Sequence, residues 1–498
     1  MLNRRALSLT FAFVIFPTLA AAAAPAPSSS HPLRAKLQPC RVSDGETGAA
    51  ALCGTYQVWE KRAAKSGRKI GLKIVVLPAQ TPHPKPDPIF FLAGGPGQAA
   101  TTIAAGMAGD PEPRNRDFVY VDQRGTGEPN RLGCELGGHE DDLQSYLGEM
   151  FPVAAVEQCR DELAKAADLT LYTTDISMDD LDEVRAWLGY GKINLFGGSY
   201  GTRAAQVYLR RHPQSVRALV LAGVVPMDET LPISHAAGGQ RSLDLLLGWC
   251  EKDAACHAKF PDTRKELAAV LDRLAHDPVT VKVRNPRSGK EAEVRLSREL
   301  VADGIRWLLY NPGNSARLPL LIHEAAAGDF APLGQAAVSS RLGVISDLAQ
   351  GLFFSVTCSE DVALIDPAQV ASRTAGSFLA DYRVRQQMAA CAVWPHARIE
   401  PSHQEAIHSD VPVLLISGER DPVTPPAFAE RAARYLTHAV QVVVPYGAHG
   451  GDDPCIEQIE RSFIAKGSAE GLDTSCVSRI KLTPFALEKP KGERAQGN

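Results

Sequence analysis

One ten-residue stretch, KINLFGGSYG at residues 192–201, constrains the fold more than any other part of the chain. It contains a G-x-S-x-G pattern with Ser199 at its centre. A short apolar run precedes the pattern and a helix-compatible segment follows it, as in the strand, sharp turn and helix that expose a nucleophilic serine at a sheet edge. Small residues flank such a serine because strand and helix pass too closely there for a Cβ atom. Taken alone, the pattern equally fits a glycine-rich turn that opens an ordinary helix.

Short apolar runs alternate with helical segments along much of the chain. The runs are typical of buried parallel strands and lie at residues 89–92, 118–121, 193–196, 216–221, 411–416 and 439–444. Two further strands are expected at 55–60 and 69–77. The alternation predicts an α/β fold with a mostly parallel, doubly wound sheet.

The sequence also predicts where this sheet is interrupted. Residues 226–408 are largely helical in pattern, with one possible hairpin at 280–294, so we expect a large helical cap inserted into the sheet domain. The first part of that domain is expected at 25–225 and the second at 409–498. Residues 1–24 are set apart as a secretory signal peptide, because a basic start, an apolar run and a small-residue zone follow one another.

Cysteine usage agrees with export to the periplasm or the medium. There are ten cysteines, an even number, and they fall into five pairs that are local in sequence. We expect nearest-neighbour bridging, which the spacing alone cannot establish. The apolar run of the leader is too short to span a bilayer, so no stable membrane association is expected once the leader is removed.

Composition and motifs exclude several classes of partner. The net charge is only −4 and 22% of residues are charged, which gives no sign of a nucleic-acid surface. No C-x-x-C or H-E-x-x-H pattern is present, so no metal and no cofactor is expected. The expected partner is a peptide or a small acyl substrate.

Two loops that follow later strands supply partners for Ser199. A serine hydroxyl needs an imidazole to take its proton, and the imidazole needs a carboxylate to orient it. Asp421 and His449 each come directly after a predicted strand, in the order Ser, Asp, His that α/β-hydrolases use. Glu419 and Asp410 compete for the carboxylate role, and Asp421 could instead cap the helix that follows it.

With these residues in place, the chain resembles a known family. The loops AGGPG, DQRGTG, GGSYGT, GERDPVTP and GAHGG together look like the tripeptidyl and prolyl aminopeptidase group of α/β-hydrolases, the cysteine-rich secreted tripeptidyl branch being the nearer match. The resemblance covers roughly 55–226 and the region from 411 onward. It implies a catalytic triad of Ser199, Asp421 and His449.

The resemblance also implies an oxyanion hole made by the backbone N–H groups of Gly95 and Tyr200. Prolyl aminopeptidases usually have histidine immediately before the GGPG loop, whereas Ala93 stands there in this chain. This difference argues against a strictly prolyl enzyme and leaves open which residue is preferred before the cleaved bond.

An aminopeptidase must also bind a free α-ammonium group, which a carboxylate projecting from the cap would do. The segment Cys358-Ser359-Glu360-Asp361 resembles a Cys-x-Glu/Asp stretch of the tripeptidyl branch, so Glu360 and Asp361 are the predicted amine-binding pair. The alternative is a helix cap or a solvated turn held by a disulfide.

These observations favour a secreted serine exopeptidase, tripeptidyl or prolyl in type, that hydrolyses peptides from a free N-terminus. A carboxylesterase or another hydrolase of small acyl substrates is the first alternative, because fold and triad do not fix the scissile bond. A catalytically inactive fold used for binding is the second, although it would require the loss of a triad member.

Overall fold

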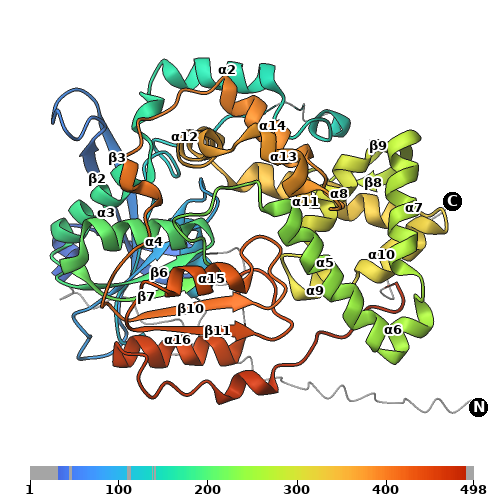
Figure 1. The fold of residues 1–498 in the computed structure, drawn as a ribbon. Coiled ribbons are helices and arrows are strands. Elements are labelled where there is room, and N and C mark those ends of the chain that lie inside the picture. Colours follow the sequence, from blue (N-terminus) through green and yellow to red (C-terminus); the bar gives the residue numbers. More distant parts are fainter. Residues whose placement is uncertain are drawn as a thin grey trace, which may run out of the picture.

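The computed structural model describes residues 32–43, 48–108, 114–136, 138, 142–451 and 453–489. The predicted signal peptide, residues 1–24, lies outside the described residues. Within them, nine strands form one sheet in the order β1-β2-β3-β5-β4-β6-β7-β10-β11 (Figure 1). Their bounds are β1 Gln38–Ser43, β2 Gly48–Trp59, β3 Lys69–Leu77, β4 Ile89–Leu92, β5 Phe118–Val121, β6 Ile193–Gly198, β7 Val216–Ala222, β10 Val413–Gly418 and β11 Ala439–Val444.

The sheet is parallel from β5 to β11, whereas β1, β2 and β3 pair antiparallel with their neighbours and with β5. Parallel strands lie between two layers of helices and are therefore apolar along their length. Strand β10 is buried at each of its residues, as this arrangement requires. The predicted parallel, doubly wound α/β sheet is confirmed, and only β1 falls outside the predicted strands.

Helices cover both faces of the sheet. One face packs against α1 (Ala100–Ala108) and α16 (Pro454–Lys466). The other packs against α3 (Thr174–Leu188), α4 (Tyr200–Arg211) and α15 (Pro426–Ala433). The carboxyl ends of the parallel strands therefore share one open edge, above which the inserted helices lie (Figure 1).

The insertion is mainly helical, as predicted, with a β8–β9 hairpin. Its elements are α5 His235–Lys252, α6 Ala254–Lys259, α7 Thr263–His276, β8 Val279–Arg284, β9 Glu291–Leu296, α8 Arg298–Leu308, α9 Pro312–Ser315, α10 Leu318–Ala326, α11 Ala331–Asp347, α12 Gln350–Glu360, α13 Pro367–Thr374 and α14 Tyr382–Ala392. Helices α13 and α14 are separated by a turn in which Gly376 has a φ of 72°.

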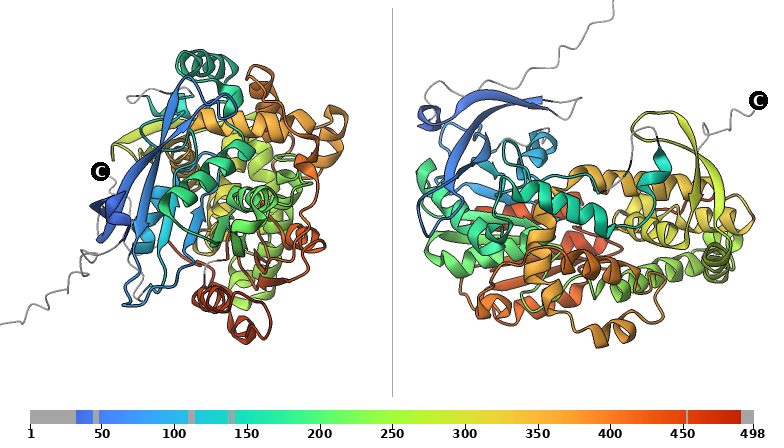
Figure 2. Two further views of the ribbon diagram at one scale, coloured as in Figure 1. Left: turned by 90° about the vertical axis from the view of Figure 1, so that its left-hand side faces the viewer. Right: turned by 90° about the horizontal axis from the view of Figure 1, so that it is seen from above.

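The insertion does not have one core of its own. Helices α5 to α11 and the hairpin share an apolar cluster, and this lobe stands beside the sheet domain (Figure 2, right). Helices α12 and α14 instead join the main cluster of the sheet domain, together with α2 (Val153–Ala164). Leu143 and Phe485, which lie outside the predicted cap at 226–408, also pack into the lobe.

All ten cysteines lie in the described residues and form five disulfides. The pairs are Cys40–Cys53, Cys134–Cys159, Cys250–Cys256, Cys358–Cys391 and Cys455–Cys476. Each links sequence neighbours among the cysteines, so the expected nearest-neighbour bridging is confirmed. In the described part of the chain, no helix combines the length and apolar character needed to cross a bilayer.

Candidate active site

The predicted nucleophile lies at a sharp turn between β6 and α4. Ser199 has a φ of 54°, a left-handed conformation that costs a non-glycine residue about 1–3 kcal/mol. A Cβ on Gly197 would come 2.4 Å from the Gly201 carbonyl oxygen, and one on Gly201 would come 2.1 Å from the Leu92 carbonyl oxygen. Both positions therefore need glycine, so the stretch is a strained elbow and not an ordinary turn.

Asp421 lies in the loop after β10 and is fully buried. Its Oδ2 is 2.8 Å from Nδ1 of His449 and accepts a hydrogen bond of 2.7 Å from the Thr424 hydroxyl. Its Oδ1 accepts from the backbone N–H groups of Val423 at 2.9 Å and Thr424 at 2.8 Å. These bonds fix the carboxylate so that one oxygen faces the imidazole.

The competing carboxylates do not reach the imidazole. Glu419 accepts a hydrogen bond of 2.9 Å from the backbone N–H of Tyr446, and Asp410 is exposed. Asp421 does not cap the following helix, because α15 begins at Pro426 with Pro425 at its N-cap and no side-chain cap bond. One oxygen of Asp421 instead bonds two N–H groups of the loop, and the other faces the ring.

His449 follows β11 and is held from two sides. Its backbone N–H donates to the carbonyl of Tyr310 at 3.2 Å, and the two rings meet edge to face with 4.9 Å between centroids. A Cβ on Gly223, after β7, would come 3.0 Å from Cε1 of His449. Ser199 and His449 line the same cavity. Tyr310 belongs to the inserted region and to no sequence motif, so its place beside His449 could not be predicted.

The glycine loop after β4 lies against the nucleophile. A Cβ on Gly94 would come 3.2 Å from Cβ of Ser199, so the loop can approach closely only because that atom is absent. Gly95 and Tyr200 both line the cavity. The Tyr200 N–H is the first of α4 and has no acceptor within the helix, and no described residue accepts from the Gly95 N–H. Both amides are thus open to a developing oxyanion, and the oxyanion hole stays a prediction that fits this geometry.

The structure separates the two residues predicted to bind the amine. Glu360 is buried in the last turn of α12 and does not line the cavity. Its carboxylate accepts from the N–H and the hydroxyl of Thr174, each at 2.6 Å, and burial raises its pKa. Glu360 therefore does not face the cavity in which an amine would bind, and it instead joins the end of α12 to the first residue of α3. The solvated-turn alternative is also wrong, since the segment is buried.

Asp361 does line the cavity. Its Oδ1 accepts from Nη1 of Arg203 at 2.7 Å and from the backbone N–H of Leu231 at 3.0 Å. Within the described residues, no donor engages Oδ2. One carboxylate oxygen is thus anchored to the sheet domain, and the other is available to a ligand.

The cavity itself measures about 320 Å³ and is closed by residues of both the sheet domain and the insertion. Sequence motifs identified lining residues on the sheet side and, in the insertion, Asp361. The insertion contributes charged and aromatic side chains that no motif marked, namely His235, Asp303, Arg306, Tyr310, Arg341, Phe353 and Arg383.

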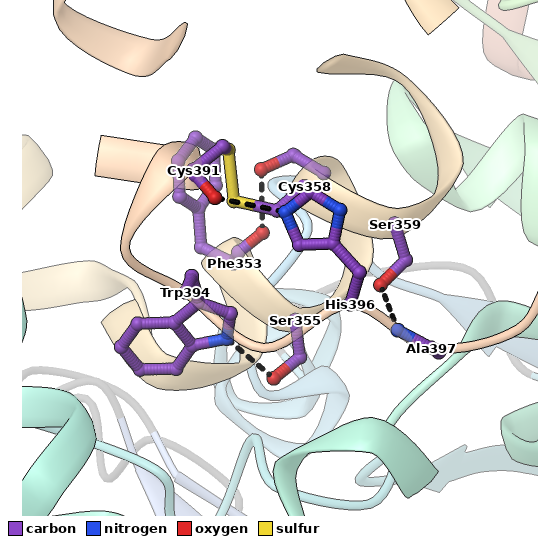
Figure 3. Close-up of a disulfide and its surroundings, with 9 residues drawn as sticks. Phe353, Ser355, Cys358, Ser359, Cys391, Trp394, His396 and Ala397 are labelled. Carbon is purple, nitrogen blue, oxygen red and sulfur yellow. Dashed lines mark hydrogen bonds between the residues drawn. A yellow bond between two sulfur atoms is a disulfide. The ribbon is translucent and has the colours of Figure 1, made fainter. Parts of the chain in front are cut away.

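A buried disulfide joins the two inserted helices that present part of this wall. Cys358 near the end of α12 bonds to Cys391 near the end of α14 (Figure 3). Next to it, the Trp394 indole N–H donates to the Ser355 hydroxyl at 3.1 Å, and the Ala397 N–H donates to the Ser359 hydroxyl at 2.9 Å. The disulfide and these bonds hold the end of α12, and with it Asp361, against α14.

Replacing Cys358 and Cys391 together with alanine should therefore affect stability and binding. The bridge closes a separation of 33 residues, for which loop entropy predicts a loss of about 3–4 kcal/mol in the free energy of unfolding. We also expect a higher KM, because Asp361 loses its support. Denaturant unfolding and steady-state kinetics on the purified variant measure both effects.

The matched control is the double alanine variant at Cys250 and Cys256, which are 6 residues apart at the end of α5 and in α6. It should lose less stability, about 2 kcal/mol, and keep the wild-type KM. Equal changes in KM in both variants would contradict the positioning role of the Cys358–Cys391 bridge.

Comparison with known proteins finds two family models that match parts of this chain. Residues 87–266, which contain Ser199, match the family model described as alpha/beta hydrolase fold. Residues 376–476, which contain Asp421 and His449, match the family model described as TAP-like protein.

Three curated relatives extend this likeness. The chain is 25% identical to "Serine protease Hip1" of Mycobacterium tuberculosis over 88% of this chain and 90% of that protein. It is 23% identical to "Tripeptidyl aminopeptidase" of Streptomyces coelicolor over 88% of this chain and 84% of that protein. It is 30% identical to "Proline iminopeptidase" of Neisseria meningitidis over 32% of this chain and 40% of that protein. Together with the sheet topology and the triad geometry, these matches identify an α/β-hydrolase enzyme related to serine peptidases and aminopeptidases.

Proposed function

We propose that this α/β-hydrolase is an exported serine exopeptidase that releases short peptides or single residues from a free N-terminus. The observation that supports this most is a buried carboxylate, Asp361, in the wall of the cavity that also holds Ser199 and His449. A volume of about 320 Å³ suits a few residues of a peptide chain, at the small end of ligand pockets.

The reaction follows from the arrangement of the triad. The Ser199 hydroxyl attacks the scissile carbonyl carbon while Nε2 of His449 accepts its proton. Asp421 keeps the Nδ1–H of the ring pointed at itself and stabilises the imidazolium that forms. The negative charge on the carbonyl oxygen develops towards the amides of Gly95 and Tyr200. The imidazolium then protonates the leaving amine, and water repeats the sequence to release the acyl group.

Recognition of the free N-terminus is assigned to Asp361. An ammonium group bound at Oδ2 would make a charge-assisted hydrogen bond in a site largely closed to water, where such bonds are strong. Arg203 holds the other oxygen, so the carboxylate is fixed in orientation. Glu149 is a second carboxylate in the cavity wall, but it is exposed and therefore a weaker anchor.

The assignment predicts that Asp361→Asn raises KM for a peptide with a free N-terminus by about tenfold or more, because the charge that pairs with the ammonium is lost. The same variant should hydrolyse a short acyl ester with nearly unchanged KM, since the ester has no ammonium to bind. Steady-state kinetics on both substrates measure the difference, and ester turnover shows in the same sample that the site is folded.

Glu149→Gln is the matched comparison and should leave both KM values near wild type. If Glu149→Gln raises KM for the free-amine peptide and Asp361→Asn does not, the amine site lies at the rim of the cavity instead. Turnover of esters alone by the wild-type enzyme would favour the carboxylesterase alternative.

Export forms part of the same proposal. The leader predicted at residues 1–24 and the pairing of all ten cysteines in disulfides both fit a protein that folds outside the reducing cytosol.

A further inference from the structure

The insertion places three arginines in the cavity wall. Arg306 of α8 and Arg341 of α11 are buried, and Arg383 of α14 is half-buried. Asp303 is the one carboxylate of the described wall that lies among them, and its negative charge acts on all three. Of the other wall carboxylates, Asp361 is paired with Arg203, and Glu149 is exposed.

Arg306 engages one oxygen of Asp303. Its Nε and Nη2 both donate to Oδ1 of Asp303 at 3.2 Å, and its Nη1 donates to the Tyr310 hydroxyl at 2.9 Å. The other two guanidinium groups have few hydrogen-bond acceptors. Nε and Nη2 of Arg341 are buried without an acceptor in the described part of the protein, and so is Nε of Arg383. Nη1 of Arg383 contacts the sulfur of Met150, and the guanidinium lies over the rings of Phe151 and Phe353, none of which is a carboxylate.

A buried cation without an acceptor is costly, because it has given up water and gained no partner. Burial and the positive charge of Arg306 lower the pKa of Arg383 to about 10, which reflects that cost. His235 adds a second unpartnered group to the same wall. It is 8% exposed, and neither of its ring nitrogens has a partner within the described residues. The wall thus offers several donors to a ligand that carries negative charge.

The cluster lies beside the catalytic imidazole. The Tyr310 ring contacts the His449 ring on one side, and the Tyr310 hydroxyl accepts from Arg306 on the other. Since His449 delivers its proton to the leaving amine, groups next to its ring flank the leaving part of the substrate. Asp361, the assigned amine anchor, is instead tied to Arg203 in α4, the helix that starts just after Ser199.

We infer that Arg306, Arg341 and Arg383, with His235, bind a carboxylate on the leaving-group side of the scissile bond. This inference rests on the proposed exopeptidase function and narrows its substrates to short peptides that carry such a carboxylate. The carboxylate comes either from a free C-terminus or from an acidic side chain. A guanidinium group suits both, because it offers two parallel donors to one carboxylate.

The test compares matched peptides of two to four residues on the wild-type enzyme. Each is made as the C-terminal free acid and as the C-terminal amide, and the amide series has Asp or Asn directly after the cleaved bond. If the site binds the C-terminal carboxylate, the free acid should have a kcat/KM about 10- to 100-fold higher than the amide; if it binds a side chain, the Asp peptide should exceed the Asn peptide by the same factor. The acid-to-amide ratio of kcat/KM thus measures recognition of a C-terminal carboxylate, and the Asp-to-Asn ratio measures recognition of an acidic side chain.

Arg383→Gln should bring the larger of these ratios close to one. Its thermal midpoint should stay close to that of the wild type, because the loss of the ring contacts with Phe151 and Phe353 is offset by the removal of a cation whose Nε is buried without an acceptor. Arg385→Gln is the matched control on the same helix. Its side chain is 60% exposed, so the variant should keep the wild-type ratio. A lower midpoint in Arg383→Gln with an unchanged ratio would mean that Arg383 is structural and would overturn the inference.

Wild-type ratios near one in both series would also overturn it. If no peptide is cleaved at all, the exopeptidase proposal fails. The carboxylate site can then still be tested by competitive inhibition of ester hydrolysis. Leucine and leucinamide are then compared as inhibitors of p-nitrophenyl acetate hydrolysis. Leucine should inhibit the wild-type enzyme at a lower concentration than leucinamide, and Arg383→Gln should remove the difference. Equal inhibition of the wild-type enzyme would refute the carboxylate site.

Discussion

Replacing Ser199 with alanine should lower kcat by about 10⁴- to 10⁶-fold on peptides and esters alike. The variant keeps the cavity, the imidazole and the oxyanion donors, so substrate binding should change little, while the covalent acyl intermediate can no longer form. The elbow should still fold, because its sharp turn depends on Gly197 and Gly201 and not on the serine hydroxyl.

Labelling with a fluorophosphonate probe tests whether Ser199 is the nucleophile without the use of a substrate. The probe should label the wild-type protein at Ser199 and leave Ser199→Ala unlabelled. Labelling of the alanine variant, or residual turnover within tenfold of the wild type, would show that another residue is the nucleophile.

The second large effect is expected for Asp421→Asn, which should lower kcat by about 10⁴-fold. Asp421 accepts four hydrogen bonds, two of them from the Thr424 and His449 side chains. An asparagine amide offers N–H donors at one of its two ends. It would either lose the backbone bonds or face the ring with a donor, and the second outcome favours the tautomer that cannot take the serine proton.

Glu419→Gln is the control for this variant. Glu419 lies two residues away and contacts the backbone of Tyr446, so its replacement should leave kcat near that of the wild type. The measurement is kcat for a short ester, with labelling by the probe as a check that Ser199 is still in place. A comparable loss in both variants would mean that the effect comes from disturbing the loop after β10, and not from the loss of the orienting carboxylate.

The catalytic side of the site could be predicted from sequence because its signals are local. The glycines of the elbow stand within one five-residue pattern, although Gly201 is required by its contact with Leu92 on another strand. Asp421 and His449 each follow an apolar strand that can be recognised on its own. The same holds for the five disulfides, which join sequence neighbours. Only the relative order of the strands had to be supplied by the fold class.

The insertion could not be predicted to the same depth, because its roles depend on packing between distant segments. Glu360 and Asp361 are adjacent in sequence. Glu360 bonds Thr174 at the start of α3, whereas Asp361 faces the cavity. Which of the two carboxylates faces the cavity depends on where α12 ends, and the residue types at 360 and 361 do not predict that position. The arginines of α8, α11 and α14 likewise meet only after three helices have packed together.

The predicted division of the chain shows the same limit. Helical periodicity predicted a helical insertion at 226–408, but periodicity does not say which core a helix joins. The apolar faces of α12 and α14 pack with the sheet domain, and Phe485 from the C-terminal segment packs on the lobe. Similar apolar patterns therefore occur in helices that pack on the sheet domain and in segments that pack within the lobe.

The most direct test is mass spectrometry of the products from one peptide of six to eight residues, supplied with a free and with an acetylated N-terminus. We predict that the free peptide loses short fragments from its N-terminal end, that the acetylated peptide is left intact, and that Ser199→Ala cleaves neither. Cleavage of both forms at equal rates, or cuts at internal bonds, would contradict an exopeptidase that binds the free amine in the cavity beside Ser199.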